Sequence, residues 1–392
     1  MLRELVITIY LFIFKFFFSL FKLFPLKKKT TLVASFGGNI LFTAKEIEAL
    51  TEDSVIILKT SKCPVYFART PRRRVLNFET NHIFHWLSSV YHLATSHNVI
   101  VDNYYGFLAV TNFKPETQCI QLWHAAGAIK QFGLKDLSIV DRSPRAFKRF
   151  NEVYKRFDQV VVGSEHMAAI FRESFGLSEE QILRTGVPRT DFFFDERLKD
   201  TAKKSLTFDF PAIKEKKVIL YAPTYRDDEL DSPQLMLDLD KLYKAFKYDY
   251  VLFLRLHPAV NGKFENKYPG FVYNVSSYSN VNQLLVIADI LVTDYSSIPF
   301  EYSLLNKPMI FYAYDLEEYE KARGFWENYE DLVPGPIVKT TNEVIQVIRE
   351  GNYDLDRVRI FAEEWNEYSK GHSSRALVQA INQKRLKLQS PT

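Results

Sequence analysis

Short apolar runs alternate with stretches of helical periodicity along most of this chain, and they fall into two blocks. The runs of the first block are Thr31–Ser35, Val55–Leu58, Asn98–Val101, Gln118–Leu122 and Gln159–Val162. Those of the second block are Lys217–Tyr221, Tyr250–Leu256, Val272–Val275, Ile290–Thr293 and Pro308–Tyr312. Apolar strands that alternate with helices are typical of parallel sheets covered on both faces. The sequence therefore predicts an α/β protein with two Rossmann-like domains that face a cleft.

The chain has 392 residues, which is more than one ordinary hydrophobic core organises. We expect an amphipathic, membrane-associating helix in residues 1–29 and a first domain in residues 30–190. The charged stretch 191–212 reads as a linker, and residues 213–392 as the second domain. No internal repeat is evident. Helical patterns are expected at Thr43–Leu50, Ile83–Ala94, Pro144–Arg156, Leu235–Phe246, Val281–Ala288 and from Leu355 to about Leu386.

Composition excludes several classes of protein. The formal net charge is only +4, which gives no strong signal for nucleic-acid binding. Cys63 and Cys119, the two cysteines, are too few for a disulfide framework or a zinc site, so we expect buried thiols in a reducing compartment. The histidines show no convincing metal-ligand spacing. The sequence predicts no metal and no cofactor.

The N-terminal segment is unusually apolar. Leu5–Phe14 contains no charged residue, but Lys15 and Lys22 break the stretch before it reaches the ~20 residues that a spanning helix needs. On a helical wheel the polar residues fall in one narrow stripe. These residues are Glu4, Thr8, Lys15, Ser19 and Lys22. Such a helix is expected to lie in the membrane interface, with the cluster Lys27–Lys29 near anionic headgroups. A single tilted span and a helix buried within the protein are the alternatives.

A candidate anion site follows the apolar run Ile290–Thr293. Asp294 ends this run, and Ser296 and Ser297 are expected to open a helix. The first N–H groups of a helix are unpaired, and the helix dipole favours negative charge there. The alternative is that the two serines only cap the helix.

Other strand ends of the second block also carry polar groups, where open α/β sheets bind ligands. Thr224 and Arg226 follow one strand, and a guanidinium offers a planar fork for phosphate oxygens. Arg255 and His257 follow the next strand and share a face, because strand side chains alternate. Together with Asp294 and the serines, they predict a cradle for a diphosphate. Arg226 in a surface pair with Asp227 or Asp228, and His257 as a core histidine, are the alternatives.

In the first block, His124 follows the strand Gln118–Leu122 and precedes the small residues Ala125–Gly127. Gly127 lets the backbone approach a ligand closely. His124 is suited to accept a proton from an alcohol. Lys130 is expected to complete the mouth of the site.

These residues occur in strings that resemble the CDP-glycerol glycerophosphotransferase family of teichoic-acid synthesis, most closely its short, primase-type members. The matching strings are Gln121–Gly127, Gly163–Glu165, Gly186–Asp191, Tyr221–Asp227, Leu256–Pro258, Thr293–Ser297, Phe300–Glu301, Asn306–Pro308 and Phe311–Asp315. The resemblance runs from about Thr31 to the C-terminus. One departure is Ala125, where some relatives carry Gly.

The resemblance implies a two-domain glycosyltransferase-B architecture and peripheral attachment to the cytoplasmic face of the cell membrane. It implies transfer of glycerol phosphate from CDP-glycerol, a substrate, to an undecaprenyl-diphosphate-linked disaccharide, with release of CMP. By family analogy His124 is the general base, and His257 acts near the diphosphate. Glu301 is expected to reach the ribose, or instead to face the helix dipole.

Several functional alternatives stay open. They are addition of a further glycerol phosphate to a primed acceptor, ribitol-phosphate transfer from CDP-ribitol, a sugar-nucleotide glycosyltransferase of the same fold, and a non-catalytic membrane scaffold. The chain lacks the extra N-terminal region of the longer polymerases, which favours limited addition. The paired histidines disfavour a scaffold. The sequence does not decide whether the protein forms homo-oligomers.

Overall fold

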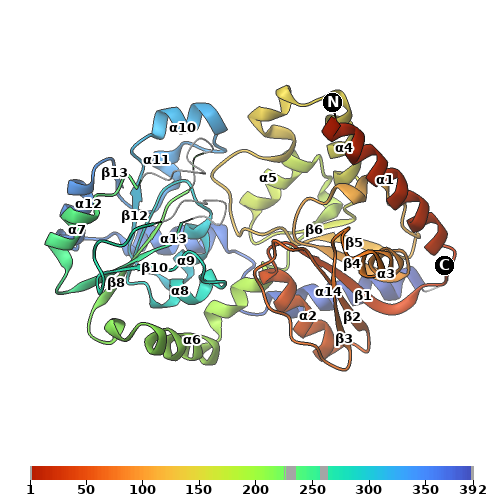
Figure 1. Cartoon of the computed structure of the whole chain (residues 1–392), viewed down its shortest axis with the longest axis horizontal. Coiled ribbons are helices and arrows are strands. Elements are labelled where there is room, and N and C mark those ends of the chain that lie inside the picture. The colour runs from red at the N-terminus through yellow and green to blue at the C-terminus, as the bar shows by residue number, and fades with distance from the viewer. Residues whose placement is uncertain (1, 225, 227–234, 257–263, 390–392) are drawn as a thin grey trace. The chain divides into compact units, whose positions relative to one another are not determined.

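The structure is a computed structural model that describes residues 2–224, 226, 235–256 and 264–389. It divides into two compact units, and each is discontinuous in sequence (Figure 1). Unit 1 consists of Met1–His124, Phe132–Asp191 and Glu367–Thr392. Unit 2 consists of Ala125–Gln131 and Phe192–Asn366.

A parallel sheet forms the centre of unit 1, with the strand order β3-β2-β1-β4-β5-β6-β7. Its strands are β1 (Lys27–Ala34), β2 (Ser54–Lys59), β3 (Arg73–Asn77), β4 (Ser96–Val101), β5 (Gln118–Gln121), β6 (Gln159–Val161) and β7 (Ile182–Leu183). Its helices are α1 (Leu2–Phe21), α2 (Gly38–Leu50), α3 (Ile83–Ala94), α4 (Pro144–Tyr154), α5 (Glu165–Phe175) and α14 (Ser373–Gln389), with the short 3₁₀ helix η1 (Gly106–Val110). On one face of the sheet, Leu32 and Ala34 pack with Ile47 of α2 and with Leu377 and Ile381 of α14.

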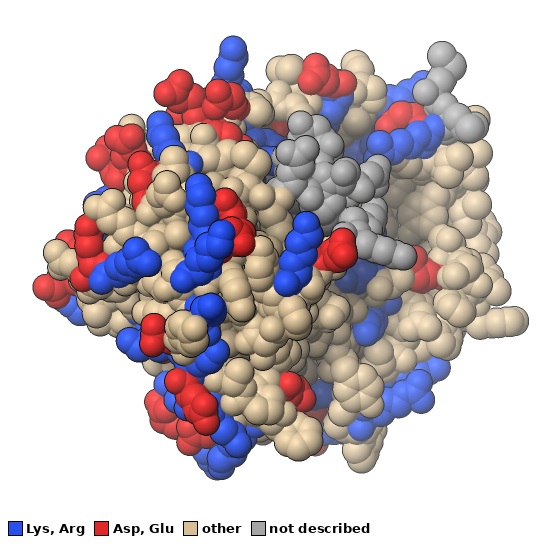
Figure 2. Space-filling view, turned by 60° about the vertical axis from the view of Figure 1, so that its left-hand side comes forward, with Lys and Arg blue, Asp and Glu red and all other residues tan. Residues whose placement is uncertain are grey.

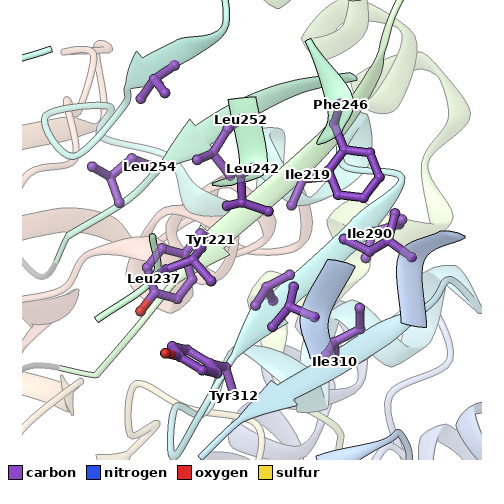
Figure 3. Packing of buried hydrophobic residues seen from close by; sticks show 14 of the residues in the cluster. Ile219, Tyr221, Leu237, Leu242, Phe246, Leu252, Leu254, Ile290, Ile310 and Tyr312 are labelled. Atoms are coloured by element: carbon purple, nitrogen blue, oxygen red, sulfur yellow. The ribbon is translucent and has the colours of Figure 1, made fainter. Parts of the chain in front are cut away.

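Unit 2 repeats this plan, with the parallel strand order β10-β9-β8-β11-β12-β13. Its strands are β8 (Lys217–Ala222), β9 (Tyr250–Leu254), β10 (Val272–Asn274), β11 (Ile290–Thr293), β12 (Met309–Tyr312) and β13 (Ile337–Val338). Its helices are α6 (Glu196–Asp209), α7 (Leu239–Phe246), α8 (Val281–Ile287), α9 (Ile298–Tyr302), α10 (Leu316–Arg323), α11 (Tyr329–Leu332), α12 (Thr341–Glu350) and α13 (Leu355–Trp365). Figure 3 shows part of the core, where Ile219, Leu252 and Ile290 from the strands lie close to Leu242 and Phe246 of α7.

The predicted α/β class with parallel sheets is therefore confirmed. Both sheets have the doubly wound order in which the first strand (β1 or β8) neighbours the fourth (β4 or β11), and the chain crosses over between them. Open sheets bind ligands outside the carboxyl ends of these two strands. This structural repetition was not visible as a sequence repeat.

The units differ from the predicted domain boundaries. Most of the expected linker 191–212 is helix α6, which Asp195 caps by accepting N–H bonds from Arg197 and Leu198. Ala202 and Leu206, one helical turn apart, are its buried residues. A narrow apolar stripe suffices to attach a helix whose other side chains are mostly polar or charged. Because charged residues dominate this stretch of sequence, it was predicted to be a linker.

The expected long C-terminal helix is two helices. α13 ends at Trp365 in unit 2, and α14 belongs to unit 1, where it packs against α2. The carboxylate of Asp191 accepts the N–H groups of Ser373 and Ser374 at the start of α14. Arg385, later in the helix, pairs with Asp53. The end of the predicted second domain is therefore part of the first unit.

The N-terminal helix α1 lies on α3 and η1 rather than apart from unit 1. Phe14 and Phe18 are buried, and the Phe14 ring contacts those of Trp86 and Phe107. Glu4, predicted to be part of an outward polar stripe, pairs with Arg149 of α4. These contacts cover one stripe of the helix, but only 11% of its apolar stretch is buried, so α1 is not the helix buried within the protein that the alternative describes.

The predicted end of this segment at residue 29 is also wrong, because β1 begins at Lys27. Lys29 is only 4% exposed and donates to Thr95 Oγ1 at 2.7 Å, so it is a sheet residue and not part of a headgroup-facing cluster. Arg3–Phe21 is nevertheless long and apolar enough to cross a membrane by length and composition, with a mean hydropathy of 2.0.

Acidic and basic side chains are interspersed on the face of the molecule that Figure 2 draws. No extended patch of one sign is evident on that face, which agrees with the small net charge of the chain.

Candidate active site

Asp102 directly follows β4 at the crossover point of unit 1 and is fully buried. Its carboxylate accepts the main-chain N–H groups of Ser35 (2.9 Å), Phe36 (3.0 Å) and Gly37 (2.7 Å), which follow β1. It also accepts the hydroxyl of Tyr105 at 2.8 Å. Burial raises the pKa of the Asp102 carboxyl, and these donors lower it. Asp102 therefore fixes the loop that leaves β1.

This loop supports the predicted base, His124. The Phe36 ring stacks on the imidazole with centroids 3.9 Å apart, and the Trp123 ring lies 4.3 Å away. His124 Nδ1 lies 3.2 Å from the main-chain oxygen of Asp102. Because a carbonyl oxygen can only accept, this hydrogen bond places the proton on Nδ1 and the lone pair on Nε2.

The electrostatic setting keeps this imidazole neutral. The pKa of His124 is lowered to about 3, mainly by burial and in part by the nearby positive charge of Arg189, whereas the hydrogen bond to the Asp102 carbonyl opposes this shift. At neutral pH the ring is uncharged, with Nε2 able to accept a proton. The arrangement can therefore perform general-base chemistry.

The backbone next to His124 is strained. Trp123 has a φ of 57°, in the left-handed region that non-glycine residues rarely adopt. Gln121 Oε1 accepts the N–H of Trp123 at 2.8 Å, and Asn39 Nδ2 donates to its carbonyl at 2.9 Å. Such strain persists where surrounding contacts enforce it, often at functional sites.

Asp294 is the counterpart of Asp102 in unit 2, because it directly follows β11 at that unit's crossover point. It is 1% exposed and accepts the N–H groups of Thr224 (2.8 Å) and Tyr295 (2.7 Å). Asp294 thus holds the Thr224 loop after β8, and its predicted contact with substrate stays a prediction. A buried carboxylate surrounded by protein donors has this positional role more readily than a ligand contact.

Arg226 pairs with two carboxylates of unit 2. Its Nε and Nη2 donate to Asp315 at 2.7 and 2.9 Å, and its Nη1 donates to Asp294 (3.1 Å) and to the Thr224 carbonyl (2.6 Å). Its side chain is 10% exposed. Asp227 and Asp228, its predicted alternative partners, lie outside the described residues. Direct contact with phosphate stays a prediction, because every guanidinium nitrogen already donates to protein.

Lys130 lies next to this ion-pair network. Its Nζ donates to the Tyr319 hydroxyl at 3.3 Å, and the Tyr319 ring stacks on Tyr295 with centroids 4.1 Å apart. The Arg226 guanidinium lies over the Tyr319 ring at 4.6 Å. Lys130, Arg226 and Asp294 come from distant parts of the sequence, and the structure brings them together in unit 2.

The predicted helix N-terminus after Asp294 is weaker than expected. Helix α9 has only five residues, and Pro299 in its first turn has no N–H to offer. Ser296 Oγ accepts the N–H of Ile298 at 3.2 Å, whereas Ser297 makes no side-chain capping bond. Both serines are half-buried. Glu301 is 1% exposed in the first turn of α9, which favours the dipole role over contact with ribose.

Of the two residues predicted at the end of β9, the structure describes Arg255 but not His257. Arg255 follows β9, and its Nη1 donates to the carbonyls of Tyr278 (2.8 Å) and Val275 (3.4 Å), so it fastens the chain after β10. Burial lowers the pKa of Arg255. His257 lies outside the described residues, and its role stays a prediction.

Gly127 is required for packing, and not only for access to a ligand. A Cβ atom at this position would overlap the Phe300 ring, which is fully buried beside Phe361 and Trp365. The segment Ala125–Gln131 therefore fits closely against the rest of unit 2.

We expect Gly127→Ala to lower the free energy of unfolding by about 1–3 kcal/mol, as overpacking of a filled core does. A lower midpoint in urea would show it. Gly106→Ala is the matched control, since nothing lies within 4 Å of a Cβ there. Equal midpoints for the two variants would contradict the packing role.

No group of three His, Cys, Asp or Glu side chains that could hold a metal ion occurs in the part of the chain that the structure describes. Cys63 and Cys119 are buried thiols, as predicted.

Residues 16–383 match the family of CDP-glycerol:poly(glycerophosphate) glycerophosphotransferases. The chain belongs to this family. It is 38% identical over 357 residues to the teichoic acid glycerol-phosphate primase of Bacillus subtilis (strain 168), covering 91% of this chain and 92% of that protein. It is 35% identical to the teichoic acid ribitol-phosphate primase of Bacillus spizizenii, covering 77% and 78% of the two chains.

Among solved structures, the wall teichoic acid polymerase TagF is similar over the full length of both chains, with a TM-score of 0.82 and 25% identity. One structure of that polymerase is of a His-to-Asn variant with CDPG. The S. aureus MnaA–UDP structure has a TM-score of 0.59 at 16% identity, covering 93% and 99% of the chains, and is similar in fold alone. These findings make the protein a glycerophosphotransferase of the family, and they confirm the predicted enzyme class and the α/β fold with two parallel sheets.

Proposed function

We propose that the protein transfers glycerol phosphate from CDP-glycerol to a hydroxyl of a polyprenyl-diphosphate-linked disaccharide and releases CMP, in synthesis of the wall teichoic acid linkage unit. The likeness to a glycerol-phosphate primase over 91% of the chain supports the substrates. The observation that supports the chemistry is the neutral, oriented imidazole of His124.

In this reaction the acceptor oxygen attacks the phosphorus that bears glycerol. The bond from that phosphorus to the bridging oxygen breaks, and CMP leaves with the electron pair. His124 Nε2 takes the proton of the attacking hydroxyl. Because the low pKa of His124 makes its protonated form costly, the negative oxygens of the donor are needed near the ring to stabilise the imidazolium.

Donor binding is assigned to unit 2. Thr224, Ser296, Ser297 and Lys130 are proposed to contact the diphosphate, which they would stabilise by position and charge. Arg226 and Asp294 hold the Thr224 loop in place. His257 is proposed to stabilise or protonate the leaving CMP.

Purified protein incubated with CDP-glycerol and a synthetic lipid-linked disaccharide should add glycerol phosphate, counted as mass added to the acceptor. Parallel reactions with CDP-ribitol, with a UDP-sugar, and with an acceptor that already carries glycerol phosphate separate the alternatives. Turnover of only the UDP-sugar would overturn the proposal. Turnover of CDP-ribitol alone would support the same type of phosphotransfer but identify ribitol phosphate, and not glycerol phosphate, as the group transferred.

We also propose that the protein attaches peripherally to the cytoplasmic face of the cell membrane through α1. The face of α1 that points away from unit 1 is apolar. Its exposed residues are Leu5, Val6, Ile9, Phe12, Ile13, Phe16 and Leu20. Exposed apolar patches of this kind mark membrane or protein contacts. Lys15, also exposed, can extend toward headgroups.

Replacing Phe12 and Phe16 by Ser should weaken binding to both anionic and neutral vesicles by more than about tenfold, because these rings are 71% and 60% exposed and free to enter the bilayer. Sedimentation with vesicles measures it. Phe208→Ser, at an 86% exposed position of α6, should leave binding unchanged. Full binding by the double variant would exclude α1 as the attachment site.

A further inference from the structure

Four arginines line one hollow along the outer edge of the unit 1 sheet. The hollow has a volume of about 500 Å³ and lies against β3, the edge strand. Its arginines are Arg69, Arg72, Arg73 and Arg74. His85 of α3 also lines it. In the sheet, β2, β1 and β4 separate β3 from β5, which precedes His124. Four strand spacings amount to roughly 19 Å, so one small ligand cannot occupy both places.

The positive charge in this hollow exceeds what the neighbouring protein neutralises. Arg73 pairs with Glu48, whose other oxygen accepts the Thr70 hydroxyl at 2.7 Å. Arg72 donates to the main-chain carbonyl oxygens of Thr51 and Glu48, and these oxygens carry no formal charge. Within the described residues, Arg69 and Arg74 are exposed and form no ion pair. Of the four guanidinium groups, Arg73 alone is paired with a carboxylate within the described residues.

Donors predominate among the polar groups of the hollow. Arg73 Nε is buried and has no hydrogen-bond partner in the described part of the chain, and such a group calls for an explanation. His85 Nδ1 accepts the N–H of Asn77 at 3.4 Å, which leaves the Nε2 proton available for donation. Guanidinium forks and an N–H donor together suit the oxygens of a phosphate group.

The surroundings of the hollow indicate where such a phosphate comes from. Ile83 and Phe84, directly before His85 on α3, are 52% and 83% exposed. Helix α3 also packs against α1, whose outer face is apolar. Basic residues beside exposed apolar ones are typical of surfaces that bind anionic lipid headgroups.

We propose that this hollow is a phosphate-binding site, separate from the donor-binding residues, that takes the headgroup phosphate of an anionic lipid. Arg69 and Arg74 provide its accessible charges, whereas Arg72 and Arg73 fasten the edge strand to the C-terminal part of α2. The site adds selectivity for anionic lipid to the apolar attachment through α1.

The test uses full-length protein with vesicles of phosphatidylcholine alone or mixed with phosphatidylglycerol. Arg69→Gln combined with Arg74→Gln should weaken binding to the anionic vesicles roughly 30-fold, since each basic residue near such a surface contributes about 1 kcal/mol. Binding to neutral vesicles and turnover of a soluble acceptor should not change. The control, Lys203→Gln with Lys204→Gln, removes the same charge from exposed positions of α6 in unit 2.

Equal losses in the two double variants would mean general attraction by charge and would overturn the site, as would unchanged binding by the arginine variant. A second arm titrates pyrophosphate into the protein by calorimetry. If the wild type binds pyrophosphate and the arginine variant does not, while that variant still binds anionic vesicles normally, the hollow is a phosphate site for a soluble anion and not for a lipid. Failure of the site would leave the proposed transfer reaction untouched, because that reaction is measured with a soluble acceptor.

Discussion

Replacing His124 by Ala is expected to lower kcat by roughly 10²-fold or more while leaving the protein folded. The imidazole is held by the Asp102 carbonyl and the Phe36 ring, and its neutral form presents Nε2 as a proton acceptor. Its removal takes away the base that the proposed reaction assigns to the acceptor proton. Turnover of CDP-glycerol with saturating acceptor, together with the midpoint of thermal unfolding, measures both expectations.

His82→Ala, at an exposed position before α3, is the matched control and should keep normal turnover. Near-normal kcat in the His124→Ala protein would exclude the base role. If the His124→Ala protein fails to fold, a second variant, His124→Gln, tests the base role instead. Its side chain keeps polarity and much of the volume of histidine but cannot act as a base at neutral pH.

The low pKa of His124 also predicts a pH dependence of stability. The folded state holds this ring neutral down to about pH 3, whereas an unfolded histidine protonates near pH 6.5. Between these values the unfolded state binds more protons, so stability falls as pH falls. The contribution is fully present above pH 6.5. Urea unfolding of wild type and His124→Ala should therefore converge, or cross, as the pH is lowered from 7 to 4.

The sequence predicts the strands well because their apolar runs are long enough to be buried on both faces. β11 occupies Ile290–Thr293, as predicted, and β8 differs from its predicted range by one residue. The edge strand β3 was missed, because Arg73–Asn77 carries two arginines and an asparagine. An edge strand has a neighbour on only one side and tolerates such residues. β7, with two residues, is too short for any pattern.

The candidate site was predicted in part. Strand-end reasoning singled out His124 as a base and Thr224 and Asp294 as substrate contacts, without the structural role that Asp294 also has. It applied equally to Asp102, which follows the apolar run ending at Val101, and would have found that residue. What sequence could not show is which strand ends become neighbours. The crossover order places Asp102 beside the loop after β1, and Asp294 beside the loop after β8.

The predicted domain boundaries differ from the observed units for a related reason. A chain that returns to its first unit, as α14 does, leaves no change of composition at the crossing. What shows that the C-terminal segment belongs to unit 1 is its close packing against residues that are distant in sequence. A Cβ at Gly186, whose φ is 80°, would overlap Tyr368 and Ser373. Such contacts become visible only in three dimensions.

The second large effect is expected for Arg226→Ala. Removing this guanidinium leaves Asp294 and Asp315 without their cation, and the Asp294 side chain is only 2% exposed. Breaking a buried pair by deleting one partner costs about 3–5 kcal/mol, because the remaining charge is uncompensated. Urea unfolding should show this loss. Lys244→Ala, which breaks the exposed pair with Asp240, should leave the urea midpoint almost unchanged.

Donor affinity then separates the two roles of Arg226. Combining Arg226→Ala with Asp315→Asn removes one orphaned charge and should restore part of the stability. If Arg226 only positions the Thr224 loop, calorimetry with CDP-glycerol should show affinity returning with stability. If Arg226 also contacts the diphosphate, affinity should stay lower by about 1.5–3 kcal/mol in both variants, the value of a charged hydrogen bond. Full donor affinity in the single variant would exclude both roles, because the loop and the phosphate would then be independent of this residue.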